Sequence, residues 1–328
     1  MKSLIWIEQN KATRVALKEV LNQYQSVFKG EVDFIFVDSL AEAEILISQG
    51  NVGYLILEPM LLKQTTAQFL KSLESLNLMF YTHLNASEFL SLAKLYKAHH
   101  VLLKEIPFFP ERFVQQLRRI LFAESYGAVW GFEEATPEVH MVQNSDDMFN
   151  VMSRIEGVLE NVLSVEARME ICTPLMEALT NAVYHAPKAS SKSDVDKYRK
   201  GEHIEALESH EAVKISINLT EDWVGIGIKD FQGTLTPERV LESICKNFTE
   251  EALYDENGRG FFLMHCLMDE LQITIEPYRS CEIMLLKSRK KIREVHSELD
   301  EIFTAEDNVT IRNKPFILNV LHPETILA

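Results

Sequence analysis

The chain is poor in the residues that mark several protein classes. It has four cysteines, Cys172, Cys245, Cys266 and Cys281, which are widely spaced without a C-x-x-C pair, so the sequence indicates neither a disulfide framework nor a zinc site. Its ten histidines form no H-x-x-x-H pattern of the kind that holds transition metals. No apolar run reaches the roughly 18–20 residues that cross a bilayer, and the N-terminus has no signal-peptide pattern. We therefore expect a cytoplasmic protein with no membrane partner.

Positive charge is also scarce. The 33 Lys and Arg residues face 49 Asp and Glu residues, a net charge of −16. Because contacts to nucleic-acid phosphates need a surplus of cations, this balance argues against nucleic acid as a partner. A hydrophobic share of 46% and a charged share of 25% are typical of globular proteins. The length of 328 residues predicts two domains at roughly 100–200 residues each.

The first 125 residues alternate between two kinds of pattern. Short apolar runs read as buried strands: Ser3–Ile7, Val32–Val37, Val52–Leu57, Leu78–Thr82 and Val101–Leu103. Segments with apolar residues at i, i+3 and i+4 lie between them and read as helices: Thr13–Tyr24, Leu40–Gln49, Thr66–Leu76, Ser87–His99 and Pro110–Glu124. Five such repeats predict a doubly wound α/β domain, with a five-stranded parallel sheet and helices on both faces.

Polar residues follow four of these strands, at the edge where functional groups gather in parallel sheets. They are Glu8, Glu58, Thr82 and Lys104. Their order resembles a response-regulator receiver domain, in which an acidic pair, a phospho-accepting Asp, a Thr or Ser and a Lys follow strands one, three, four and five. Here Glu8-Gln9 keeps one acid of the metal-binding pair, and Glu58 stands at the phospho-acceptor position.

The glutamate at position 58 matters chemically. Its carboxylate lies one methylene further out, so in-line attack on a phosphoryl donor would be misaligned, and the loss of one acid weakens the metal site. We therefore favour a degenerate receiver-like domain, kept for docking or dimerisation, over an active phospho-receiver.

The repeat stops after Tyr126. Val129–Phe132 and Glu138–Val142 resemble edge strands, and Ser145–Leu163 is an amphipathic helix with Ser145-Asp-Asp as its cap region. The next predicted helix, Ser164–Ala186, carries three polar residues spaced four apart and hence on one face: Glu177, Asn181 and His185. Pro174, with Thr173 as a cap, predicts a new helix start or a kink within it.

Two glycine-containing segments follow this helix. The strand-like run Trp223–Lys229 ends in Asp230-Phe-Gln-Gly233, and the turn Gly258-Arg259-Gly260 directly precedes a predicted helix, Phe261–Leu271. Since no strand precedes the second turn, it does not fit a dinucleotide-binding fingerprint. It does expose backbone N–H groups at a helix N-terminus, where phosphate binds readily.

Together these segments resemble the GHKL ATPase superfamily over about Met141 to Lys287. Glu177–Ala186 is similar to its N box, Asp230–Gly233 to its first glycine box, and Gly258–Gly260 to its second. The trailing His-Ala of the N box is similar to that of bacterial anti-sigma-factor serine kinases. The resemblance implies an α/β-sandwich ATP-binding domain of the Bergerat type over residues 126–287, with residues 288–328 as a C-terminal extension.

The resemblance also implies roles for individual residues. Glu177 would be the general base for the attacking hydroxyl, and Asn181 would hold Mg²⁺ against the phosphates of ATP. Asp230 would accept a hydrogen bond from the adenine amino group. Gly233 would allow a close backbone approach, although Gln232 and Thr234 replace the glycines usual in the first box. The phosphates would lie against Gly258, Arg259 and Gly260, beneath a lid drawn from about Leu241 to Asn257.

Three functions fit these patterns. An anti-sigma-type kinase would phosphorylate a serine of a small anti-sigma antagonist and sequester a sigma factor, commonly as a homodimer. A non-catalytic scaffold, with or without ATP, would act by protein contacts alone. A sensor histidine kinase needs a phospho-accepting histidine on its dimerising helix; Ser145–Leu163 contains none, His140 lies outside it, and we interpret His185 as structural.

Two regions lie outside the motifs. Pro187–Ser209 is polar and charged, and is predicted to be an inserted loop with a short helix at Ile204–Ser209. The tail contains a predicted charged helix, Arg289–Phe303, and a strand-like run, Pro315–Leu321, which we expect to dock onto the body or a partner.

Overall fold

The computed structural model describes residues 2–28, 30–83, 86–98, 100–104, 110–122, 137–186, 206–221, 223–246, 260–289 and 316–320. The chain divides into two compact units, Met1–Glu124 and Ser125–Ala328, and each is taken by itself. Within the described ranges, no helix combines the length and apolar character needed to span a membrane.

The first unit is built on a five-stranded sheet whose neighbouring strands all run parallel. Its strands are β1 (Lys2–Ile7), β2 (Val32–Val37), β3 (Val52–Leu57), β4 (Asn77–Thr82) and β5 (His100–Leu103). They lie in the order β2-β1-β3-β4-β5, the doubly wound order of flavodoxin-like domains. The unit is therefore consistent with a receiver-like fold.

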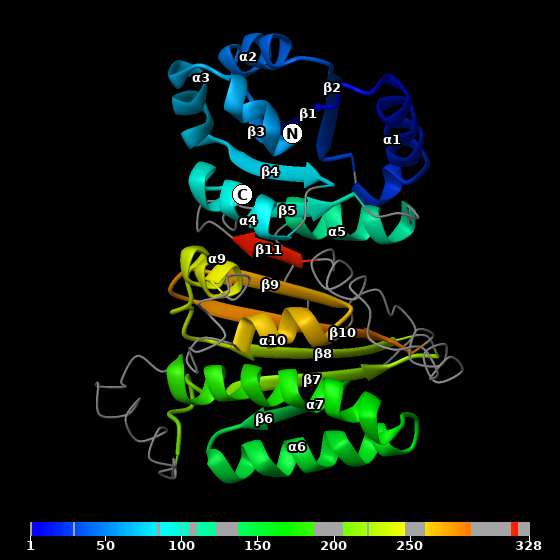
Figure 1. The fold of residues 1–328 in the computed structure, drawn as a ribbon, viewed down its shortest axis with the longest axis vertical. Coiled ribbons are helices and arrows are strands. Elements are labelled where there is room, and N and C mark those ends of the chain that lie inside the picture. The colour runs from blue at the N-terminus through cyan, green and yellow to red at the C-terminus, as the bar shows by residue number, and fades with distance from the viewer. Residues whose placement is uncertain are drawn as a thin grey trace. The chain divides into compact units, whose positions relative to one another are not determined.

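Helices cover both faces of this sheet (Figure 1). They are α1 (Lys11–Gln23), α2 (Leu40–Ser48), α3 (Ala67–Ser72), α4 (Ala86–Tyr96) and α5 (Pro110–Phe122), with short 3-10 turns at Gln25–Phe28, Pro59–Gln64 and Leu73–Ser75. Figure 1 shows α1 and α5 on one side, and α2 and α3 on the other. Side-chain oxygens of Asn10, Ser39 and Thr66 cap the first turns of α1, α2 and α3, which satisfies backbone donors that would otherwise be unpaired.

Aromatic residues fill the core between the sheet and the helices α1 and α5. The fully buried Trp6 stacks on Phe36 at 5.4 Å between ring centroids and meets Tyr81 edge-on at 5.2 Å. Such pairs add stability beyond the burial of their area. Because β1, β3, β4 and β5 are parallel neighbours, their carboxyl ends lie along one edge of this rigid sheet.

The second unit contains a six-stranded sheet with the order β11-β9-β10-β8-β7-β6. Its pairs are antiparallel except for β11, which runs parallel to β9. The strands are β6 (Glu138–Val142), β7 (Val213–Leu219), β8 (Trp223–Asp230), β9 (Glu270–Glu276), β10 (Ser280–Ser288) and β11 (Phe316–Val320). The strand predicted in the tail thus extends the sheet of this unit.

The described part of the second unit contains the helices α6 (Ser145–Glu160), α7 (Val165–Thr180), α9 (Pro237–Lys246) and α10 (Gly260–Leu267). A single π-helical turn, η5 (Asn181–His185), continues α7. Helix α7 packs between α6 and α10, and Figure 1 draws the three as a layer against the sheet. The α/β fold predicted for both halves is therefore confirmed.

A buried lysine joins α7, α10 and β10. Lys287 Nζ donates to the carbonyl of Leu267 at 2.7 Å, at the C-terminus of α10, and lies 2.7 Å from Glu170 Oε2 on α7. A cation at a helix C-terminus is favourable because the carbonyls there carry partial negative charge. The contact anchors helices α7 and α10 to strand β10 of the sheet.

Several sequence predictions for the second unit differ from the structure in detail. Helix α10 ends at Leu267 and β9 begins at Glu270, because the backbone N–H of Asp269 already pairs with Leu286 of β10 at 2.9 Å. Asn144, rather than Ser145, caps α6, which ends at Glu160 instead of Leu163. Helix α7 continues through the buried Pro174, so the predicted new helix start at this position is wrong.

A further difference concerns the predicted helix at residues 204–209. Its described part, from Ala206 onward, is a loop in which Leu207 N–H bonds to the carbonyl of Gln143 at 2.6 Å, a donor that a helix would use internally. Three predicted segments lie outside the described residues. They are the strand Val129–Phe132, the part of the Pro187–Ser209 loop before Ala206, and the Arg289–Phe303 helix after its first residue.

Candidate functional site

A pocket in the second unit gathers residues from segments far apart in the sequence. Residues from η5, from the end of β8 and the loop after it, and from α9, α10 and β10 line it. They are Asn181, Ala182, Ala186, Ile228, Asp230, Thr234, Leu235, Arg239, Ser243, Gly260, Phe261, Cys281 and Ile283. Three segments that resemble the N box and the two glycine boxes therefore contribute to one pocket.

Glu177, Asn181 and Gly260 lie together at this pocket. A Cβ atom placed on Gly260 would lie 2.9 Å from Glu177 Oε2 and 3.3 Å from Asn181 Nδ2. Gly260 is also the first residue of α10, so the partial positive charge of that helix N-terminus meets the carboxylate. A side chain at position 260 would require the Glu177 carboxylate to move from this position.

The Glu177 carboxyl is half buried, and this burial raises its pKa above the ordinary value of a glutamate. Desolvation disfavours the charged form of the group, so it binds a proton more readily than an exposed carboxylate does. A carboxylate with a raised pKa suits general-base work near neutrality.

The π turn positions Asn181 and the residues after it. Ala186 N–H donates to the Asn181 carbonyl at 3.0 Å, the i to i+5 spacing that widens a helix. The Tyr184 hydroxyl lies 2.9 Å from Ser145 Oγ at the start of α6. The Thr234 hydroxyl donates to the Ala186 carbonyl at 3.2 Å. The turn is thus held from both sides, by α6 and by the loop after β8.

Asp230 ends β8 and is 8% exposed. Burial raises its pKa, although hydrogen bonds from the backbone N–H groups of Gln232, Gly233 and Cys281 and the charge of Lys229 act in the opposite direction. Its Oδ1 accepts from Gln232 N–H at 2.9 Å and from Gly233 N–H at 3.2 Å. The carboxylate is therefore fixed in orientation, beside apolar residues of the pocket such as Ile228 and Ile283.

The loop after β8 explains the residues that depart from the usual glycine box. The buried Gln232 side chain bonds to the His210 carbonyl at 3.2 Å and does not line the pocket, whereas Thr234 does. Gly233 has a φ of +57°. A Cβ on it would lie 2.4 Å from Arg279 N and 2.6 Å from Glu276 O. Its missing side chain thus serves the packing of this loop against the β9–β10 turn.

The sequence patterns missed two polar lining residues, Arg239 and Ser243 of α9. The segment predicted to form a lid, from about Leu241 to Asn257, begins within α9, which ends at Lys246, and Leu241 is buried. Gly258, Arg259 and the remainder of that segment lie outside the described residues. The i, i+4 spacing of Arg239 and Ser243 was the available signal, because it places both on one helix face.

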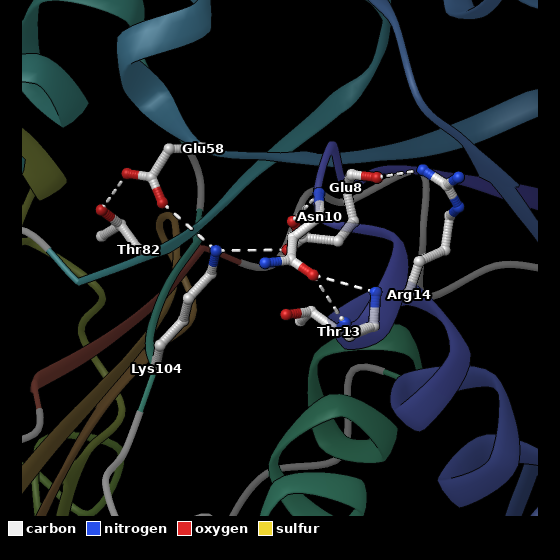
Figure 2. Close-up of polar contacts among 8 residues, drawn as sticks. Glu8, Asn10, Thr13, Arg14, Glu58, Thr82 and Lys104 are labelled. Atoms are coloured by element: carbon white, nitrogen blue, oxygen red, sulfur yellow. Dashed lines mark hydrogen bonds and ion pairs between the residues drawn. The ribbon is translucent and has the colours of Figure 1, made fainter.

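The four receiver-like residues gather in the first unit (Figure 2). Lys104 Nζ lies 3.2 Å from Glu8 Oε2 and 3.4 Å from Glu58 Oε2, and the Thr82 hydroxyl donates to Glu58 Oε1. The other Glu8 oxygen accepts from Asn10 N–H at 3.0 Å. We call Glu8, Glu58, Thr82 and Lys104 the strand-end cluster.

Lys104 occupies the centre of the strand-end cluster. Its side chain is 13% exposed, and its ammonium lies 5.0 Å from the centre of the Tyr81 ring. A lysine paired with both carboxylates neutralises the charge that a divalent cation would otherwise meet there. The sheet brings the predicted residues together, but their contacts form a closed network of hydrogen bonds and ion pairs.

Comparison with known proteins finds a match for part of the second unit. Residues 143–284 match the family model of the histidine kinase-like ATPase domain, and the α/β fold of this unit matches the GHKL ATPase domain. No curated protein matches the chain. The match indicates an ATP-binding, kinase-like regulatory domain, and GHKL domains of this type bind ATP, usually with Mg²⁺.

The described residues of the pocket fit such a nucleotide. A buried carboxylate between apolar side chains, at Asp230, suits a flat base with an amino donor. An amide beside a helix N-terminus, at Asn181 and Gly260, suits Mg²⁺ and phosphate.

Proposed function

We propose that the second unit is an ATP- and Mg²⁺-dependent serine kinase of the anti-sigma type, which acts on a protein partner. The proposal is carried by one observation: Glu177 and Asn181 lie against Gly260 at the pocket that also contains Asp230. These residues come from segments up to 83 positions apart, Glu177 to Gly260. A base, a metal ligand and a phosphate-binding helix terminus are the parts that phosphoryl transfer needs.

Each residue then has a distinct task. Glu177 accepts the proton of the attacking serine hydroxyl, which forms the new O–P bond as the bond to ADP breaks. Asn181 offers its amide oxygen to the metal, and Asp230 accepts a hydrogen bond from the adenine amino group. A Mg²⁺ ion held by Asn181 would offset the negative charge of the transferred group.

The proposed partner is an anti-sigma antagonist carrying the target serine, or a sigma factor held by the same surface, with the protein acting as a cytoplasmic homodimer. The first unit is proposed to be a pseudo-receiver that regulates the second through protein contacts. The closed ion pairs of Lys104 with Glu8 and Glu58 support a docking role for it over phosphorylation.

A non-catalytic scaffold is the competing function. Gln232 and Thr234 replace two glycines, and Thr234 lines the pocket, where its methyl and hydroxyl groups take space that a glycine would leave open. Such a pocket could bind nucleotide and signal its presence without transferring phosphate.

The deciding experiment titrates wild type, Glu177→Gln and Glu177→Ala with a fluorescent ATP analogue, with and without Mg²⁺, and then measures ADP formation and transfer to partner serine. If the protein is a kinase, all three proteins bind the analogue, and binding depends on Mg²⁺. Phosphate transfer to the partner serine is then lost in both variants. Thr173→Val, on the exposed side of α7, serves as a control and keeps full activity. Tight binding of the analogue by wild type without any phosphate transfer would contradict the kinase proposal and favour the scaffold.

A further inference from the structure

The pocket of the second unit carries an unusual balance of charge. Among its described lining residues, Asp230 is the one anion and Arg239 the one cation. Glu177 adds a second carboxylate beside Gly260, in a protein whose net charge is −16. A polyphosphate entering this site meets two carboxylates, so it needs positive charge from the protein as well as from a metal ion.

Helix α9 directs Arg239 toward the pocket. Thr236 Oγ1 accepts from the Arg239 N–H at 3.3 Å and so caps the helix start. Val240, Leu241 and Ile244 are buried and hold the helix against the body. Arg239 and Ser243, four residues apart, both line the pocket and therefore share one face of the helix.

The guanidinium group of Arg239 is available to a ligand. Its residue is exposed, and no ion pair engages it among the residues that the structure describes. It does not pair with Asp230: the cation that lowers the Asp230 pKa is Lys229. Arg239 thus brings a positive charge, unpaired among the described residues, to a pocket that Asn181 and Gly260 also line.

We propose that Arg239 binds the polyphosphate of the nucleotide, with Ser243 as a neighbouring hydroxyl donor, and that it sets the preference for ATP over nucleosides. The role rests on the proposed ATP binding of this unit. A planar guanidinium group donates two parallel hydrogen bonds to phosphate oxygens, which a lysine ammonium does not reproduce. Arg239 would supply a phosphate contact from α9, a helix that contains none of the N box and glycine-box residues.

The test measures the dissociation constants of ATP, ADP and adenosine for wild type, Arg239→Gln and Arg239→Lys by competition with a fluorescent ATP analogue. Arg239→Gln should weaken ATP about 10- to 100-fold, the loss expected for a hydrogen bond to a charged group, and leave adenosine unchanged. Arg239→Lys should recover part of the affinity. The ATP affinity of wild type should fall more steeply with salt than that of Arg239→Gln.

Arg154→Gln is the matched control, since Arg154 is an exposed arginine of α6 paired with Glu138; its affinities should equal those of wild type. Equal ATP affinity in wild type and Arg239→Gln would overturn the role of Arg239 alone. An equal loss of ATP and adenosine would also overturn it, because the arginine would then act on the base or on the fold. Wild type that binds no nucleotide would refute the proposed function itself, and the Arg239 role with it.

Discussion

At the scale of single residues, two glycines have separate reasons to lack a side chain. Gly260 leaves room for Glu177 and Asn181, whose side chains are flexible. Gly233 combines a left-handed backbone with backbone atoms of Glu276 and Arg279 that cannot move aside. The first glycine therefore serves the site, and the second serves the fold around it.

Gly233→Ala should destabilise the protein. The left-handed backbone alone costs a residue with a Cβ about 1–2 kcal/mol, and the contact 2.4 Å from Arg279 N adds to it. Denaturant unfolding measures the change. Gly157→Ala, in the interior of α6 with nothing near its Cβ, should instead stabilise by up to about 1 kcal/mol. Equal stabilities for the two variants would contradict this assignment.

The Glu177 pKa predicts how turnover depends on pH. Only the ionised carboxylate can accept the serine proton, and burial raises the pKa of this group, so ionisation is completed at a higher pH than for an exposed glutamate. Phosphate transfer should therefore rise with pH through the raised pKa and be lost as the pH falls below it. Initial rates across pH, compared with Glu177→Gln, measure the profile. A profile centred within the ordinary glutamate range would show that Glu177 is not the titrating base.

At the scale of elements, the site depends on how the N-box helix ends. The π turn η5 follows α7, and the loop after β8 holds it through the Thr234–Ala186 hydrogen bond. The Tyr184–Ser145 contact ties the same turn to α6. The position of Asn181 is therefore set by three elements that are distant in sequence.

Thr234→Val removes the donor while it keeps the side-chain shape. We expect a loss of about 1 kcal/mol in unfolding free energy, the net value of a typical hydrogen bond, and weaker Mg²⁺-dependent ATP binding because the turn that carries Asn181 is held from one side only. Calorimetry and nucleotide titration measure both effects. Thr173→Val, at an exposed position of α7, is the control. Unchanged binding with reduced stability would limit this bond to a structural role.

At the scale of the whole molecule, two units each contain their own sheet and core. The strand-end cluster belongs to the first and the nucleotide pocket to the second. Each unit therefore supplies its own packing energy, and a defect in one cluster is expected to leave the other site able to bind its ligand.

Lys104→Met tests this separation. It leaves Glu8 and Glu58 without their shared cation in a site where their side chains are 9% and 29% exposed. The first unit should lose about 1–3 kcal/mol, while ATP affinity at the second stays as in wild type. Thermal unfolding with nucleotide titration measures both, and Lys63→Met, at an exposed position, is the control. Loss of ATP binding in Lys104→Met alone would show that the pocket depends on the first unit.

Much of the fold could be predicted because its patterns are local. β2, β3 and β6 have the predicted bounds, and the other predicted strands of the first unit differ by one residue at one end. Buried apolar runs and helical spacing are visible in a short window of sequence. The predicted end of α10 was wrong because the Asp269 N–H donates to the carbonyl of Leu286 on β10 instead of continuing the helix. A short window of sequence around Asp269 does not contain this distant acceptor.

The amino-acid sequence by itself determined the types of chemical group and their order: acids and a lysine after strands, an acid and an amide four residues apart on a helix, and glycines before another. Local spacing is enough for these. Only the tertiary structure decided that Gln232 turns away from the pocket, that Gly233 packs on the β9–β10 turn, and that Arg239 faces the site. Side-chain direction depends on neighbours brought close by packing, and those neighbours lie tens of residues away along the chain.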